Sequence, residues 1–384
     1  MKRNSGLFSC GLIWFGAAIS VAEIEAGIEA GANWSALILG HLLGGAMLFA
    51  AGLIGARQRQ GAMATTTSAF GTWGARFFAL LNVIQLVGWI AVMNEQATAA
   101  LSQLQGVFDS WVTHIVLSAL VGVWVIVGIL RTSRLATVAM TLLALLTAYL
   151  SWKLCAGVAG TSSGGLAFWP AFELSAAMPL SWVPVIADYT KDAVRPVAAS
   201  AVSTAVYTVA SLWMYALGIL IGQGGEGSTL AAAITVHGLA LVGVPILVVS
   251  TVTTNLLAAH SSGESACVVS SRFNAKIVVA LVCAGGAALS ITGIAGHYIH
   301  FLYFIASVFA PMAAVLVVSH FLVKRQATLW NVASWLVGFI AYHVCSAYAF
   351  APTVVSLALS AALALMPRVA KVFCNGKLNE RFGK

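Results

Sequence analysis

Charged side chains are scarce in this chain of 384 residues. Only 8% of the residues are Asp, Glu, Lys or Arg, and 60% are hydrophobic, whereas charged residues make up about 25% of an average soluble domain. This composition argues against an ordinary soluble globular protein. The formal net charge of +8 is spread thinly, and no basic run or base-stacking motif accompanies it, so we expect no nucleic-acid partner.

Recognisable motifs of enzymes and of metal centres are also lacking. The six Cys and eight His residues show no metal-ligand spacing. His41 is open to two interpretations, a tuned polar group or a packing histidine. No nucleophile elbow, phosphate loop or paired catalytic motif occurs, so we expect the protein not to be an enzyme.

Long apolar runs fill most of the chain. A helix needs about 20 apolar residues to cross the hydrocarbon core of a bilayer, and twelve runs meet that need. The sequence therefore predicts an all-α polytopic membrane protein with twelve transmembrane helices. They are expected at 7–31, 34–56, 76–101, 111–130, 135–155, 170–190, 197–222, 230–260, 275–295, 298–323, 328–348 and 351–370.

Basic residues set the expected orientation. All of the 19 Lys and Arg residues except Lys153 fall in alternate junctions between the runs or in the two termini. Cytoplasmic loops collect Lys and Arg because positive charge is poorly translocated. We expect a multi-pass protein of the cytoplasmic (inner) membrane with both termini in the cytoplasm.

Two of the expected spans are interrupted. The first holds Gly16 to Ser20 at mid-depth and then Glu23, while the sixth carries Pro179 and Pro184. A proline removes a backbone donor, and carbonyls freed inside a bilayer must be buried in protein or line a wet cavity. The simpler interpretation is that Gly16 is a helix-packing residue and that Pro179 only kinks its helix.

The interrupted spans occupy matching places in two sets of five. Because five is odd, the second set crosses the membrane in the opposite sense. This arrangement predicts inverted repeats with a binding site near the midplane. We expect a first repeat at 1–155, a second at 156–325 and two further helices with the tail at 326–384, within one membrane domain.

Span eight carries a row of hydroxyls. Ser250, Thr253 and Thr254 share one helix face, and oxygen ligands suit a hard cation. Opposite a broken first helix, they predict a sodium site. Hydrogen bonds between helices are the alternative.

Span three offers a face for a flat ring. Gln85 and Trp89 are four residues apart and lie on one side of a helix, so that a heterocycle could stack on the indole while the amide binds its polar edge. Trp182 is a second possible stacking face. Simple packing is the alternative for either indole.

Acidic residues inside apolar spans are costly and often functional. They are Glu23, Glu25, Glu95 and Glu173. Glu23, just beyond the first interruption, is the leading candidate to bond a substrate or exchange a proton. Proton coupling therefore stays open beside sodium coupling.

Taken together, several segments resemble the nucleobase–cation symporter family over nearly the whole chain. The residues from Gln85 to Trp89 and from Ala177 to Trp182 most resemble those of its hydroxymethylpyrimidine permease branch. The segments that carry the resemblance are Leu12 to Ser20, Gly52 to Arg57, Phe70 to Gly74, Gly88 with Trp89, Ala187 to Lys191, Ser250 to Asn255 and Ser307 to Met312.

This resemblance implies a leucine-transporter-like fold with broken helices one and six. It places sodium at the carbonyls of Gly16, Ile19 and Ser250 and the hydroxyls of Thr253 and Thr254. It assigns stacking to Trp89, and it aligns Pro179 with the family's second stacking aromatic, for which Trp182 is the nearby substitute. The substrate-binding residues we expect are Trp89, Gln85, Glu23, Ser20, Met178, Trp182 and Asn94.

The expected function is secondary active import of a planar, hydroxymethylpyrimidine-like compound by sodium symport with alternating access. Such a compound is a thiamin precursor, and sodium is the coupling ion. The alternatives are a cytosine, purine or hydantoin permease, proton-coupled symport and, in a different class, a passive channel. We expect a monomer whose partners are a small heterocycle and the lipid bilayer.

Overall fold

The structure is a computed structural model, and it describes residues 6–105, 111–127, 133–157, 165–223, 229–236, 238, 240–323 and 328–382. Within these ranges, the single isolated bridge between Gly31 and Gly165 is the only β geometry. Residues 158–164, half of the segment between the expected fifth and sixth spans, lie outside the described residues. So do the basic residues Lys2, Arg3, Arg131, Lys324, Arg325 and Lys384, on which part of the orientation argument rests.

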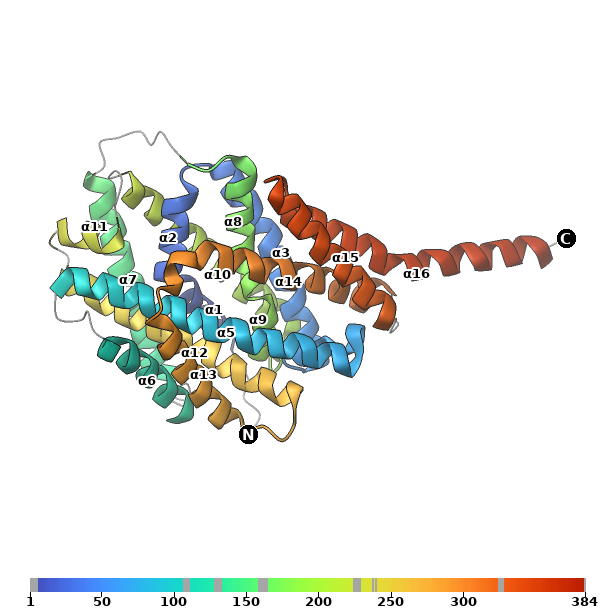
Figure 1. Cartoon of the computed structure of the whole chain (residues 1–384), viewed down its shortest axis with the longest axis horizontal. Coiled ribbons are helices and arrows are strands. Elements are labelled where there is room, and N and C mark those ends of the chain that lie inside the picture. The colour runs from blue at the N-terminus through green and yellow to red at the C-terminus, as the bar shows by residue number, and fades with distance from the viewer. Residues whose placement is uncertain are drawn as a thin grey trace.

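Helices make up nearly all of the described chain (Figure 1). In order they are α1 (Leu7–Ala18), α2 (Val21–Ala30), α3 (Trp34–Gln58), α4 (Ala62–Thr65), α5 (Thr67–Gln105), α6 (Trp111–Val127), α7 (Ser133–Gly157), α8 (Phe168–Ser181), α9 (Val183–Thr190), α10 (Pro196–Gly222), α11 (Leu230–Val236), α12 (Ala240–Val269), α13 (Ala275–Ser290), η2 (Ile294–His297), α14 (Tyr298–Val318), η3 (Ser319–Val323), α15 (Thr328–Ala347) and α16 (Pro352–Phe382).

Each of the twelve expected spans coincides with one of these helices or with a pair of them. Seven helices among the described residues, and the bent pair α1 and α2, are long and apolar enough to cross a membrane. The predicted all-α polytopic architecture is confirmed. The run expected at 230–260 differs in detail, because it forms a short α11 followed by the longer α12.

The outside of the protein is apolar. Leu241, Leu329 and Trp73 are 91%, 86% and 80% exposed, and so large an apolar surface is stable when lipid covers it. By contrast, 94% of an apolar 18-residue window of the span Phe168–Thr190, formed by α8 and α9, is buried inside the protein, against 22% of such a window of Thr328–Ala347, which is α15. The sixth span is therefore central and α15 is peripheral.

The helix contacts repeat in pairs. Helix α3 packs on α8, and its counterpart α10 packs on α2; α5 packs on α13, and its counterpart α12 packs on α6. Such exchanged pairs are what two inverted sets of five helices produce. The exact division of the chain at residues 155 and 325 stays a prediction.

Glu173 anchors the last two helices to the centre of the fold. This residue of α8 is 3% exposed. Its carboxylate accepts hydrogen bonds from the hydroxyl of Tyr342 in α15 at 2.6 Å and from both the backbone N–H and the hydroxyl of Thr353 in α16, at 3.0 and 2.6 Å. Three donors from α15 and α16 therefore converge on one buried group.

We expect Glu173→Gln to lower the thermal stability of the purified protein. The amide nitrogen cannot accept a hydrogen bond, so one buried donor loses its partner, at a cost of about 1–3 kcal/mol. Unfolding in detergent measures the shift. Glu264→Gln is the control, because Glu264 pairs with Lys191 at 2.6 Å but is 38% exposed, and exposed pairs contribute about 0–1 kcal/mol. Equal shifts for the two variants would contradict the assignment.

Candidate functional site

The first span breaks at Ile19 and Ser20. Helices α1 and α2 meet there at an angle of 56°, with Ser20 in an extended conformation (φ −140°, ψ 156°). The Ser20 hydroxyl accepts a hydrogen bond from the backbone N–H of Glu23 at 3.2 Å, which caps the start of α2. The predicted interruption is confirmed, and the serine with a glutamate three residues later is its local sequence signal.

Helix α12 reaches the carbonyls at this break. The Ser250 hydroxyl donates to the carbonyl oxygen of Ile19 at 2.5 Å, and the Thr254 hydroxyl donates to that of Gly16 at 3.3 Å. Thr253 donates to the carbonyl oxygens of Val249 and Ser250 in its own helix, at 2.7 and 3.0 Å. The five residues expected to bind sodium therefore lie together between α1, α2 and α12.

The ligands that these residues offer fit a hard monovalent cation. Three main-chain carbonyls and two hydroxyls are neutral oxygen donors, which favour such ions over soft transition metals. A hydroxyl that now donates to a carbonyl can rotate and present a lone pair instead. Within the described ranges, no group of three or more His, Cys, Asp or Glu side chains is placed to hold a metal.

The sixth span is interrupted more gently than the first. Helix α8 continues through Pro179 to Ser181, and α9 begins at Val183. Trp182 between them keeps a right-handed backbone (φ −92°, ψ −8°), but its N–H bonds to the carbonyl oxygen of Pro179 in a tighter turn. Pro184 lies in the first turn of α9, where a missing N–H is tolerated. Together α8 and α9 form a single 23-residue span. The break is thus at Trp182, between the prolines rather than at either of them.

Trp89 belongs to an aromatic group that joins several helices. Its indole makes edge-to-face contacts with Tyr298, at 6.0 Å between ring centroids, and with Phe301, at 5.7 Å. The Tyr298 hydroxyl donates to the carbonyl oxygen of Ala22 at 3.1 Å and lies 3.9 Å from the sulfur of Met178. Tyr298, which sequence reasoning missed, therefore connects Trp89, Met178 and α2.

Trp182 belongs to a different aromatic group. Its ring lies edge-on to Trp14 at 5.7 Å and to Tyr207 at 6.5 Å. These contacts place Trp182 beside α1 and α10. The two indoles expected to stack on a substrate thus pack into separate clusters in this structure.

The expected polar contacts are only partly available. The Gln85 amide donates to Asn82 at 2.6 Å, while its buried carbonyl oxygen has no partner among the described residues. Asn94 donates to Ser118 and accepts from Asn255 at 2.9 Å, so its amide links α5 to α6 and α12. Of these two side chains, Gln85 keeps an acceptor to offer to a ligand.

Glu23 is buried, with 1% of its surface exposed. Its two carboxylate oxygens accept from the Tyr207 hydroxyl at 2.6 Å and from the Ser211 hydroxyl at 2.7 Å. Both partners are on α10. The carboxylate therefore holds α2 against α10 one turn beyond the break.

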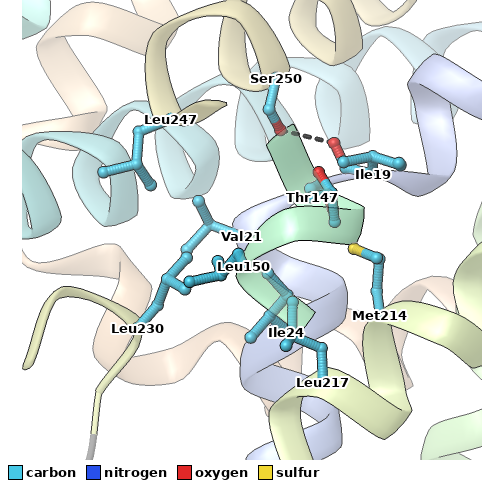
Figure 2. Close-up of a pocket in the computed structure, with 11 residues that line it drawn as sticks. Ile19, Val21, Ile24, Thr147, Leu150, Met214, Leu217, Leu230, Leu247 and Ser250 are labelled. Carbon is cyan, nitrogen blue, oxygen red and sulfur yellow. Dashed lines mark hydrogen bonds between the residues drawn. The ribbon is translucent and has the colours of Figure 1, made fainter. Parts of the chain in front are cut away.

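A pocket adjoins the break on the side of α7 and α10 (Figure 2). Its volume of about 10 Å³ has room for about one water molecule, and in the figure the Ser250 hydroxyl is bonded to the Ile19 carbonyl at its edge. Most of the lining is aliphatic, so it does not recognise a polar ring. Its lining residues are Ile19, Ser20, Val21, Ile24, Thr147, Leu150, Met214, Leu217, Leu230, Leu247 and Ser250.

Asp188 joins α9, the second half of the sixth span, to its neighbours. Its carboxylate accepts from the backbone N–H of Ala62 at 2.8 Å and from the Ser261 hydroxyl at 2.5 Å. One residue further on, the Tyr189 hydroxyl donates to the carbonyl oxygen of Leu257 at 2.9 Å. These contacts join α9 to α4 and α12, and they account for two of the polar residues of the Ala187 to Lys191 segment.

No family model matches the chain, and no curated protein sequence matches it. Solved structures do. A structure of Mhp1, a nucleobase-cation-symport-1 family transporter, in a closed conformation with bromovinylhydantoin bound, matches with a TM-score of 0.77 at 20% identity, over 97% of this chain and 94% of that one.

The chain has the leucine-transporter-like fold. An inward-facing conformation of Mhp1 also matches with a TM-score of 0.77, at 19% identity over 97% of this chain and 92% of that one. A Na⁺-coupled sialic acid symporter in a substrate-bound, outward-open state matches with a TM-score of 0.73, at 12% identity over 95% and 90% of the two chains. Identities this low establish the fold and leave the cargo and ion to be argued from the site.

Proposed function

We propose that this protein is a secondary active transporter that imports a planar pyrimidine-type compound by sodium symport with alternating access. One observation carries the proposal: the hydroxyls of Ser250 and Thr254 in α12 reach the carbonyls of Ile19 and Gly16 at the break in the first span. A sodium ion bound among these oxygens would join the two inverted repeats. Its binding would therefore favour one of the alternating arrangements over the other.

The proposed cargo is a flat ring resembling hydroxymethylpyrimidine, a thiamin precursor. Bromovinylhydantoin, which Mhp1 binds, is likewise built on a flat heterocycle. The unpartnered carbonyl oxygen of Gln85 and the indole of Trp89 supply an amide and an aromatic face of the kind that such rings require. The other residues proposed to contact the cargo are Glu23, Ser20, Met178, Trp182 and Asn94.

The remaining details belong to the same proposal. We place the protein in the inner membrane as a monomer, with both termini in the cytoplasm, and assign it no enzymatic activity. A passive channel would equilibrate its solute without concentrating it. A cytosine, purine or hydantoin permease would share the ion site and differ in the contacts to the ring.

Uptake by purified protein in liposomes tests the function. An inward sodium gradient should drive accumulation of labelled hydroxymethylpyrimidine above its outside concentration, and unlabelled pyrimidine inside should accelerate entry by counterflow. Parallel assays with cytosine, a purine and a hydantoin would identify the preferred ring. Entry that stops at equal concentrations would overturn symport in favour of a channel, and accumulation driven by a proton gradient in sodium-free buffer would replace sodium as the coupling ion.

Trp89→Ala should weaken substrate binding far more than Trp89→Phe. Stacking of a base on an aromatic ring contributes about 1–3 kcal/mol, so we expect KM to rise about tenfold or more for alanine and much less for phenylalanine. Trp152→Ala is the control, because Trp152 is 62% exposed. Equal KM values for the two Trp89 variants would remove the stacking role.

A further inference from the structure

A continuous chain of buried hydrogen bonds runs from Glu23 to the backbone of α3. Ser211 lies 2.7 Å from the Glu23 carboxylate and 2.7 Å from Nε2 of His41. On the other side of the ring, Nδ1 of His41 lies 2.6 Å from the Ser175 hydroxyl, which donates to the carbonyl oxygen of Leu37 at 2.5 Å. Two titratable side chains are thus connected through one serine.

This chain is closed to solvent and joins four central helices. Glu23 is 1% exposed, and His41, Ser175 and Ser211 are 0% exposed. Glu23 is on α2, His41 on α3, Ser175 on α8 and Ser211 on α10. A change of charge here would act on both broken spans at once.

Few other titratable groups face it. Tyr207 donates to Glu23, the ring of Tyr215 lies edge-on to His41 at 4.9 Å, and Tyr298 of α14 approaches the main chain of α2 at Ala22. Glu25, further along α2, is bonded to Gln96 of α5. Glu173 of α8 is directed to α15 and α16 instead. Among the described residues, no Lys or Arg makes an ion pair or hydrogen bond with this chain.

The hydrogen bonds can all be made with one proton shared between Glu23 and His41. With a protonated Glu23, the carboxyl donates to Ser211, Ser211 donates to Nε2, and Nδ1 donates to Ser175. If the proton moves along Ser211, a positively charged His41 donates to Ser211, which donates to a negatively charged Glu23. In both arrangements Ser175 donates to Leu37, and every polar atom of the chain has a partner.

Removing that proton changes the charge of the network and leaves its side-chain hydrogen bonds in place. A neutral His41 protonated at Nε2 donates to Ser211, Ser211 donates to Glu23, and Ser175 turns from Leu37 to donate to Nδ1. The carboxylate then keeps an uncompensated negative charge in the interior, which is strongly unfavourable. The network is therefore electrically neutral when it holds one proton and negatively charged when it holds none.

We propose that Glu23, Ser211 and His41 form a binding site for one exchangeable proton. The site is distinct from the proposed sodium ligands, because Glu23 touches none of them and follows Ile19 by one turn of chain. Release of the proton would loosen α2 from α3, α8 and α10 at the position where the first span bends. The inference rests on the burial of Glu23 without a cationic partner and on its hydrogen-bonded connection to His41, and not on any cargo.

The test is the pH dependence of thermal unfolding of the purified full-length protein, at constant sodium and without substrate. Above about pH 6.5 an unfolded His and an unfolded Glu hold no proton, while the folded site still holds one. The folded-to-unfolded ratio should therefore fall about tenfold per pH unit until the site releases its proton, and level off beyond.

Glu23→Gln should abolish this fall. The amide donates to Ser211 as the protonated carboxyl does and accepts from Tyr207, but it cannot release a proton. Glu173→Gln is the matched control: it is another buried glutamate of the core, joined to no histidine, and it should keep the fall. A wild-type ratio that is constant between pH 7 and 10, or a Glu23→Gln variant that still falls as the wild type does, would overturn the proposal.

His41→Gln provides a second and independent outcome. Its carbonyl accepts from Ser211 and its amide donates to Ser175, so the proton stays on Glu23. The folded state then holds one proton more than the unfolded state from about pH 4.3 upward, and the fall should begin about two pH units lower than in the wild type. An unchanged onset would also contradict the shared site.

Discussion

Uptake should lose its dependence on sodium when Thr253 and Thr254 are both replaced by alanine. A hydrogen bond to a charged group contributes about 1.5–3 kcal/mol, and we expect a hydroxyl bound to the ion to contribute as much. Each 1.4 kcal/mol is a factor of ten, so removing both should weaken sodium affinity about a hundredfold or more. Initial uptake rates measured against sodium concentration in liposomes give this affinity directly.

Thr251→Ala is the matched control for this variant. Thr251 lies on the same helix, is 1% exposed, and its hydroxyl has no partner among the described residues. Its removal should leave the sodium dependence intact. The double variant should still fold, because the Thr253 hydroxyl bonds only to its own helix and the Thr254 hydroxyl contributes a single hydrogen bond between helices, to Gly16 at 3.3 Å. A folded double variant with normal sodium stimulation would refute the ion site.

Gly218→Ala should be strongly destabilising, although alanine is the better helix former. A Cβ atom at Gly218 of α10 would lie 2.0 Å from the carbonyl oxygen of Ile24 and 2.8 Å from the backbone nitrogen of Ile28, both in α2. Backbone atoms cannot turn aside as a side chain can, so the helices must separate. We expect a loss of about 1–3 kcal/mol, seen as a lower unfolding temperature.

Gly222→Ala, one turn further along α10, separates this close approach from a general effect of glycine. The nearest atom to its added Cβ would be the Ile28 Cγ2 at 3.5 Å, an ordinary contact. Replacing glycine by alanine inside a helix contributes about 1 kcal/mol of stability, so this variant should unfold at the same or a higher temperature. If Gly218→Ala behaved in the same way, α2 and α10 would not cross as closely as described.

The break in the first span could be predicted from local sequence, whereas the place of the sixth break could not. Ser20 and Glu23 have the spacing of a helix start, which acts through the backbone of a few neighbouring residues. Pro179 and Pro184 suggest an interruption in their region, but proline is accepted in the first turn of a helix. Packing on all sides of α8 and α9 decided that Trp182 is the residue that separates the two helices.

The candidate ion site was accessible to sequence reasoning because its parts are periodic. Ser250, Thr253 and Thr254 share a face by helical spacing, and the repeat argument placed that face opposite the first span. The aromatic contacts were not accessible in this way. Tyr298 meets Trp89 across two helices far apart in the chain, and no local pattern reports such a contact.

The same limit applies to the proton site. Glu23 was singled out by its depth in an apolar run, but Ser175 and Ser211 are ordinary serines in ordinary spans. Their significance depends on contacts across 134 residues, from His41 to Ser175, and across 188 residues, from Glu23 to Ser211. Only the packed helices bring these atoms within hydrogen-bonding distance.

By itself the sequence determined the all-α architecture, the irregular first span and the hydroxyl face of α12, because apolar length, capping and helical periodicity act over a few residues. Tertiary structure alone decided which indoles pack together and where the sixth span is interrupted. It also decided that Glu23 and His41 are both hydrogen-bonded to Ser211. Those outcomes depend on how side chains from distant helices fill one another's space, and burial makes every unpaired polar atom among them costly.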